Sequence, residues 1–144
     1  LLAYALPAGA LTPVNTPFAN GITLRGMVAA PETLTPGGLL TMHLDWAAAD
    51  APATAQPDAA GGDLKVFVQL LDGAGQLVAQ DDRPLVLSGP RAAGSGLAVY
   101  GLMLPGELPD GPYRLITGLY DPMQSGAPRV LTVDGADHIV LRTF

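Results

Sequence analysis

The chain has 144 residues and no cysteine, so it is long enough to bury a core as one domain and offers neither disulfides nor thiol chemistry. Its net charge is −6, and its seven basic residues are too few for the basic surface that a nucleic-acid partner requires. Although 49% of the residues are hydrophobic, no run approaches the roughly 18 apolar residues of a membrane-spanning helix.

The first 20 residues are expected to form an extended lead-in or linker. They contain Pro7, Pro13 and Pro17 and show no alternation of apolar and polar residues. The chain starts at Leu1 without the basic start of a signal peptide, which favours a cloned fragment or a processed product.

Residues 21–144 are predicted to form a single all-β domain, because 18 glycines and 14 prolines divide the chain into short segments without helical periodicity. Eight strands are predicted, at residues 22–29, 39–46, 64–72, 76–83, 97–104, 113–120, 129–133 and 138–144. This number favours an antiparallel β-sandwich of about eight strands, immunoglobulin-like or jelly-roll-like. Residues 47–62, rich in Ala, Pro, Gly and Asp, are interpreted as a mobile insertion.

The segment 39–46 has the clearest strand pattern. Its apolar residues alternate with polar ones and end at Trp46, so one face should be buried and the other exposed. We therefore expect Trp46 to lie in the core.

The segment Lys65–Asp82 reads as two strands joined by a short loop at Gly73, Ala74 and Gly75. Glycine reaches the positive φ angles that a tight return needs, so a hairpin is predicted here. A tyrosine corner is predicted further on, because Gly111 and Tyr113 precede a strand at the spacing found in immunoglobulin-like sandwiches.

No catalytic residue, metal ligand or cofactor site emerges from the sequence. His43 and His138 lie far apart, and neither has a second ligand nearby to complete a zinc site. A calcium site is not favoured either, because the sequence has no Asp-x-Asp-x-Asp loop. Ser95 lacks the flanking glycines of a nucleophile elbow, and no pair of carboxylates is singled out by its spacing as in a glycosidase. Aspartates beside turns are better explained by backbone capping.

Carbohydrate binding remains an alternative, because sandwiches bind sugars through exposed aromatic rings supported by polar side chains. Tyr100 and Tyr120 are the best stacking candidates, with Asp81 and Asp82 as hydrogen-bonding partners. An ordinary place in the core is the competing interpretation for these rings.

Four segments together resemble the C-terminal β domain of some bacterial polytopic glycosyltransferases, which are similar to dolichyl-phosphate-mannose protein mannosyltransferases. They are residues 18–24, 39–46, 65–82 and 108–122, and the most specific pieces are Lys65–Asp82 and Gly118-Leu119-Tyr120-Asp121-Pro122. The sequence departs from that family at Arg91-Ala92-Ala93-Gly94-Ser95-Gly96, where the family usually has a threonine, a tryptophan and a Gly-Glu pair.

The resemblance implies a noncatalytic accessory domain on the extracytoplasmic face of the bacterial cell membrane. Its partner would be the membrane portion of its own parent chain, where the catalytic acid lies, and it would help to position a glycan or another acceptor. The alternatives are a carbohydrate-binding module and a structural β-sandwich of a surface protein.

Overall fold

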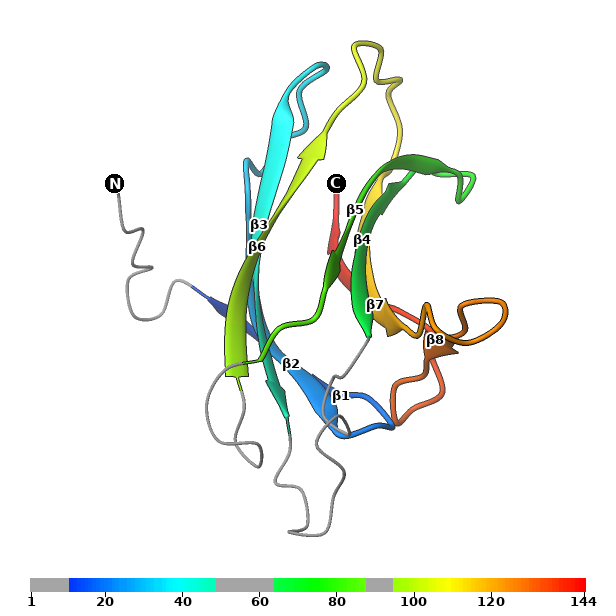
Figure 1. Cartoon of the computed structure of the whole chain (residues 1–144). Coiled ribbons are helices and arrows are strands. Elements are labelled where there is room, and N and C mark those ends of the chain that lie inside the picture. The colour runs from blue at the N-terminus through cyan, green and yellow to red at the C-terminus, as the bar shows by residue number, and fades with distance from the viewer. Residues whose placement is uncertain (1–10, 49–63, 88–94) are drawn as a thin grey trace, which may run out of the picture.

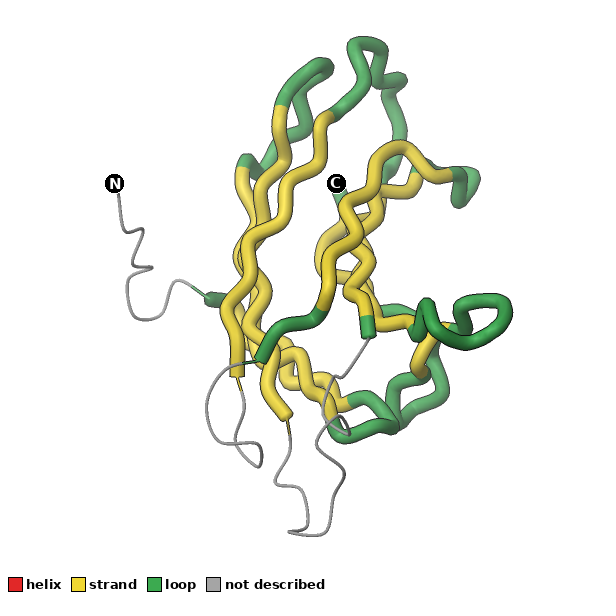
Figure 2. Tube along the Cα trace, viewed as in Figure 1, coloured by secondary structure: helices red, strands yellow, loops and turns green. Residues whose placement is uncertain are grey.

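The structure is a computed structural model that describes residues 11–48, 64–87 and 95–144, and all regular structure in these ranges is β. The strands are β1 (Thr12–Pro17), β2 (Ile22–Ala30), β3 (Leu39–Ala48), β4 (Lys65–Leu71), β5 (Leu77–Pro84), β6 (Ser95–Met103), β7 (Arg114–Tyr120), β8 (Arg129–Val130) and β9 (Ile139–Thr143). Two antiparallel sheets face each other (Figures 1 and 2), which confirms the predicted β-sandwich. Within these ranges, no helix is long and apolar enough to cross a membrane.

The strand order identifies the kind of sandwich. One sheet has the order β1-β2-β3-β6, and the other has the order β5-β4-β7, with β8 and β9 both pairing with β7. The chain thus forms the β2-β3 hairpin in one sheet and the β4-β5 hairpin in the other, then returns for β6 and crosses again to β7. These are the crossings of an immunoglobulin-like sandwich, with β4, β7 and β9 in the places of strands C, F and G.

The core lies between the sheets and includes the stripe predicted on β3. Leu40, Met42, Leu44 and Trp46 are all 0% exposed. The indole ring of Trp46 packs against Phe18, with 6.0 Å between the ring centroids. The expectation that Trp46 is a core residue is therefore confirmed.

The boundary between lead-in and domain lies earlier than residue 21. Thr12–Pro17 form the edge strand β1, which pairs with β2, and Phe18 is buried beside Trp46. The prolines hid this strand, but an edge strand tolerates proline because one side of its backbone needs no ladder partner. Of the predicted insertion at 47–62, residues 47 and 48 belong to β3, and residues 49–62 lie outside the described ranges.

The predicted hairpin is present as β4 and β5. Val66, Val68 and Leu70 point into the core, and the carboxylate of Asp72 caps the turn by accepting hydrogen bonds from the backbone N–H groups of Ala74 and Gln76, both at 2.9 Å. Gly75 has a φ of +81°, as the tight return requires. β4 lies inside its sheet, between β5 and β7, so its other face is also available to build a site.

Candidate functional site: a tyrosine-aspartate patch on the outer face of a sheet

The four predicted carbohydrate-binding residues fall into two separate pairs. Asp81 and Asp82 are neighbours on β5, so their side chains leave opposite faces of the strand. Asp82 meets Tyr120 on the outer face of the β5-β4-β7 sheet, whereas Asp81 faces the β6 edge near Tyr100. Tyr100 is 1% exposed, so its ring is not available to stack on a sugar.

The Tyr120 hydroxyl donates a hydrogen bond of 2.9 Å to Asp82 Oδ2. The two residues lie on strands that flank β4 on its two sides, at positions paired with Phe67 and Lys65. Partial burial and the bond to Asp82 raise the pKa of Tyr120. The hydroxyl therefore stays protonated at neutral pH, and the pair presents the remaining lone pairs of a carboxylate and a phenol beside a partly exposed ring.

Phe67 forms the floor of this patch. The centroids of the Phe67 and Tyr120 rings are 6.4 Å apart. The guanidinium carbon of Arg129 lies over the Phe67 ring, 4.2 Å from its centroid. A Cβ at Gly118 would lie 2.5 Å from each of two ring atoms of Phe67, so the ring can approach the backbone of β7 this closely only because this residue is glycine.

Arg129 extends the patch toward the segment that precedes β9. Its guanidinium contacts Asp137 at 3.6 Å and reaches Gln69 Oε1 at 3.5 Å. Asp137 also contacts His138 Nδ1 at 2.7 Å, and this contact, together with the charge of Arg129, lowers the pKa of the Asp137 carboxyl. Sequence reasoning missed Arg129, because it lies 60 residues from Gln69 and only the pairing of β8 with β7 brings the two together.

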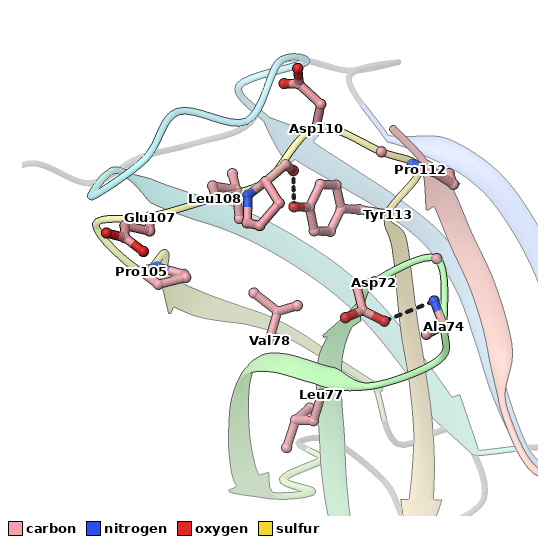
Figure 3. Close-up of a pocket in the computed structure, with 13 residues that line it drawn as sticks. Asp72, Ala74, Leu77, Val78, Pro105, Glu107, Leu108, Asp110, Pro112 and Tyr113 are labelled. Carbon is pink, nitrogen blue, oxygen red and sulfur yellow. Dashed lines mark hydrogen bonds between the residues drawn. The ribbon is translucent and has the colours of Figure 1, made fainter.

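A second concave region lies at the end of the sandwich where the β4-β5 hairpin meets the segment between β6 and β7 (Figure 3). The Tyr113 hydroxyl donates a hydrogen bond to the Pro109 carbonyl, which confirms the predicted tyrosine corner. This end holds a pocket of about 460 Å³ lined by proline, leucine and valine side chains and by Asp72, Glu107 and Asp110. Because the Asp72 carboxylate already caps the hairpin turn, we interpret this region as structural.

Asp121, at the end of β7, also caps a turn. The Asp121 carboxylate accepts hydrogen bonds from the Met123 N–H at 3.0 Å and from the Gln124 side chain at 2.7 Å. His43 stands on β3, whereas His138 lies just before β9, a strand of the other sheet. Among the residues described, no three His, Asp or Glu side chains gather as they would around a metal ion.

No protein family and no curated protein matches this chain. Among solved structures, it is similar to a glycosyl hydrolase family 2 member from Bacteroides cellulosilyticus, with 11% sequence identity and a TM-score of 0.43. The likeness covers 84% of this chain and 14% of that protein. At this level of similarity it carries no argument about function, which has to come from the site itself.

Proposed function

We propose that this chain is a noncatalytic accessory domain of a bacterial membrane glycosyltransferase, placed on the extracytoplasmic face of the membrane, and that it helps to position the acceptor. One observation carries the proposal. The two most specific pieces of the resemblance, Lys65–Asp82 and residues 118–122, meet in space at the hydrogen bond between Tyr120 and Asp82. An exposed phenol and carboxylate on one face offer a ligand both an aromatic ring and hydrogen-bonding groups.

The chemistry of the patch suits an acceptor that carries hydroxyl groups. Asp82 and the Tyr120 oxygen accept hydrogen bonds, the Tyr120 ring offers an apolar face, and Arg129 and Gln69 supply donors. The chain as a whole carries a charge of −6, which disfavours a phosphate-rich ligand. A glycan or a peptide rich in serine and threonine matches these groups best.

The test is binding by the purified chain, followed by NMR, with methyl mannoside and a threonine-rich peptide as probes. Affinity should be weak, with a Kd on the order of 1 mM, as expected for a small ligand on an open face. Tyr120→Ala and Asp82→Ala should abolish binding. Asp45→Ala is the matched control, because Asp45 is also a carboxylate in a side-chain contact but belongs to the other sheet, where it pairs with Arg25 at 3.1 Å.

Catalysis is tested separately with polyprenyl-phosphate sugars and aryl glycosides. The chain should release no sugar from either donor. Turnover that disappears when Asp72, Asp81, Asp82 or Asp121 becomes Ala would contradict the noncatalytic assignment and place a reaction at this sandwich.

A carbohydrate-binding module is the second candidate, and the same Tyr120–Asp82 pair favours it. The sequence upstream in the gene separates the candidates. Multiple membrane spans support the glycosyltransferase accessory domain, whereas a soluble glycosidase domain supports the binding module. Tandem sandwiches without spans would instead indicate a structural part of a surface protein.

A further inference from the structure

The turn between β1 and β2 carries an asparagine followed by a glycine. Asn20 is exposed, and Gly21 has a φ of +91°, in the left-handed region that favours glycine. Asn20 Oδ1 accepts a hydrogen bond from the Ile22 N–H at 3.1 Å. This bond turns the side-chain amide toward the backbone that follows it, as in other turns that asparagine begins.

The arrangement places the side-chain amide where the next backbone nitrogen can attack it. When the Gly21 nitrogen attacks Asn20 Cγ, negative charge develops on Oδ1, and the Ile22 N–H already donates to that oxygen. A fixed donor aimed at a developing oxyanion lowers the barrier to acyl transfer. Glycine lowers it further, because it has no side chain to obstruct the approach of the amide.

Two other places in the chain each lack one part of this arrangement. At Asp72, which also precedes a glycine, Oδ1 accepts from the Ala74 N–H at 2.9 Å, but a carboxylate is a much weaker electrophile than an amide. Asn15 is the only other asparagine, and Thr16 follows it in the edge strand β1. Within the described ranges, only Asn20 combines an amide, a following glycine and a backbone donor to Oδ1.

One hydrogen bond of the turn opposes the reaction. The Gly21 N–H donates to the Phe18 carbonyl at 3.1 Å, and the nitrogen must lose this proton to become a nucleophile. Turns with exposed tips open at a lower free-energy cost than the ladders inside a sheet. The reaction should therefore proceed from the folded protein, at a rate that rises with hydroxide concentration.

We propose that Asn20 is a site of spontaneous deamidation in the folded protein. The Gly21 nitrogen gives its proton to hydroxide and bonds to Asn20 Cγ, while the side-chain nitrogen takes a proton from water and leaves as ammonia. The product is a cyclic imide. Water then adds to one of the two imide carbonyls and opens the ring to aspartate or isoaspartate. This site is independent of the acceptor function proposed for the outer face of the other sheet.

Isoaspartate at this position would loosen the contact between the two sheets. The Ala19 N–H donates to the Leu131 carbonyl at 2.8 Å, so the turn is fastened to the segment after β8 (Figure 1). Phe18, beside this bond, is 1% exposed. Isoaspartate adds a methylene group to the backbone between residues 20 and 21 and shifts these partners. Aspartate leaves the backbone unchanged and keeps an acceptor for the Ile22 N–H.

The test is incubation of the folded chain at neutral and at mildly alkaline pH. Chymotryptic cleavage after Phe18 separates Asn15 from Asn20 before mass spectrometry. The peptide with Asn20 should gain the mass of an amide-to-acid conversion, faster at the higher pH, with an equal amount of ammonia released. The peptide with Asn15 should keep its mass. Methylation by a protein isoaspartate methyltransferase measures the isoaspartate, and a sample digested before incubation corrects for conversion during digestion.

Two variants separate the turn from the residue pair alone. Thr16→Gly places a glycine after Asn15, in an edge strand rather than at the turn. Asn15 should then react severalfold more slowly than Asn20 in the same molecule. Asn20→Asp supplies the aspartate product without isoaspartate, so it should unfold at the parent's denaturant midpoint. Incubated protein enriched in isoaspartate should unfold at a lower one.

Three results would overturn the proposal. The first is an Asn20 that keeps its amide in the folded chain while the chain unfolded in urea loses it, because the turn would then protect the amide. The second is an Asn15 that reacts as fast as Asn20 in Thr16→Gly, and the third is a rate at Asn20 that does not change with pH.

Discussion

The two tyrosine-aspartate pairs use the same residue types in opposite environments. Tyr120 and Asp82 meet on an outer face, where the phenol donates directly to the carboxylate. Tyr100 is buried near Asp81, whose carboxylate instead accepts from the Gly101 backbone and from Arg83. One step along β5 separates the two aspartates, so strand alternation alone places one on the outer face of the sheet and the other on the face toward the second sheet. The buried pair should therefore control stability and the exposed pair should not.

The largest effect is expected from a substitution of Trp46 in the core. Trp46→Ala should lower the free energy of unfolding by about 3–5 kcal/mol, because a large buried ring is lost and a cavity remains. Denaturant unfolding followed by circular dichroism measures the change. A variant that unfolds at the parent's midpoint would show that Trp46 is not part of the packed core.

Alkaline pH should also act through the buried pair. The pKa of Tyr100 is raised to about 12 by burial, whereas the unfolded chain has the ordinary value of 10.0. Its contribution to stability is therefore complete below pH 10 and is lost as pH rises toward about 12, by up to about 3 kcal/mol. Unfolding measured across this range should depend less on pH in Tyr100→Phe than in the parent. An identical pH dependence in both would contradict the burial of the hydroxyl.

Neighbouring aspartates give the most direct comparison. Asp81→Ala should cost about 1–3 kcal/mol of unfolding free energy, because the Gly101 N–H loses its acceptor between the sheets. Asp82→Ala, one residue away, should cost less than about 1 kcal/mol, since its bond to Tyr120 is exposed. Thermal melts of the two variants check this. Equal losses of stability would contradict the difference between the inward-facing Asp81 and the exposed Asp82.

The smallest effects on stability are expected from removing single tyrosine hydroxyl groups, at Tyr113 and Tyr120. The Tyr113 hydroxyl bonds to the Pro109 carbonyl, so Tyr113→Phe should cost about 0.5–1.5 kcal/mol. Tyr120→Phe should change stability less and should lower binding of the hydroxyl-bearing probes. Denaturant titrations of the two variants measure the difference. A larger loss of unfolding free energy in Tyr120→Phe than in Tyr113→Phe would contradict the structural role of the Tyr113 hydroxyl.

The sequence predicted much of the fold because its clearest strands alternate in polarity or end at diagnostic turns. The stripe ending at Trp46, the β4-β5 hairpin and the tyrosine corner all depend on local patterns of this kind. β1 was missed, since its prolines resemble a linker and its pairing with β2 is not visible in the sequence. Phe18, beyond the end of β1, is buried beside Trp46 for the same tertiary reason.

The candidate site was less predictable, and β6 shows why. Both of its faces are apolar, because Leu97, Val99 and Met103 are exposed while Tyr100 and Leu102 are buried. Polarity alone could not tell which face of this strand meets the core, so Tyr100 was a stacking candidate by sequence. Tyr120 and Asp82 were both named, but their pairing across β4 depends on sheet order.

The close approach of the β5-β6 connection to β6 affects how the chain meets other copies of itself. A Cβ at Gly96 would lie 2.4 Å from the Val86 carbonyl oxygen, so the backbone after β5 presses directly on the start of this edge strand. Further along β6, the Gly101 N–H donates a hydrogen bond to the Asp81 carboxylate and is therefore not free to pair with another strand. An open edge strand is the usual place where sheets of separate molecules join into aggregates. The backbone at Val86 covers one end of β6, and the Asp81 carboxylate covers a donor further along. Both oppose the pairing of β6 with a strand of another molecule. The first of these contacts depends on glycine at position 96, because a side chain there would collide with the Val86 carbonyl.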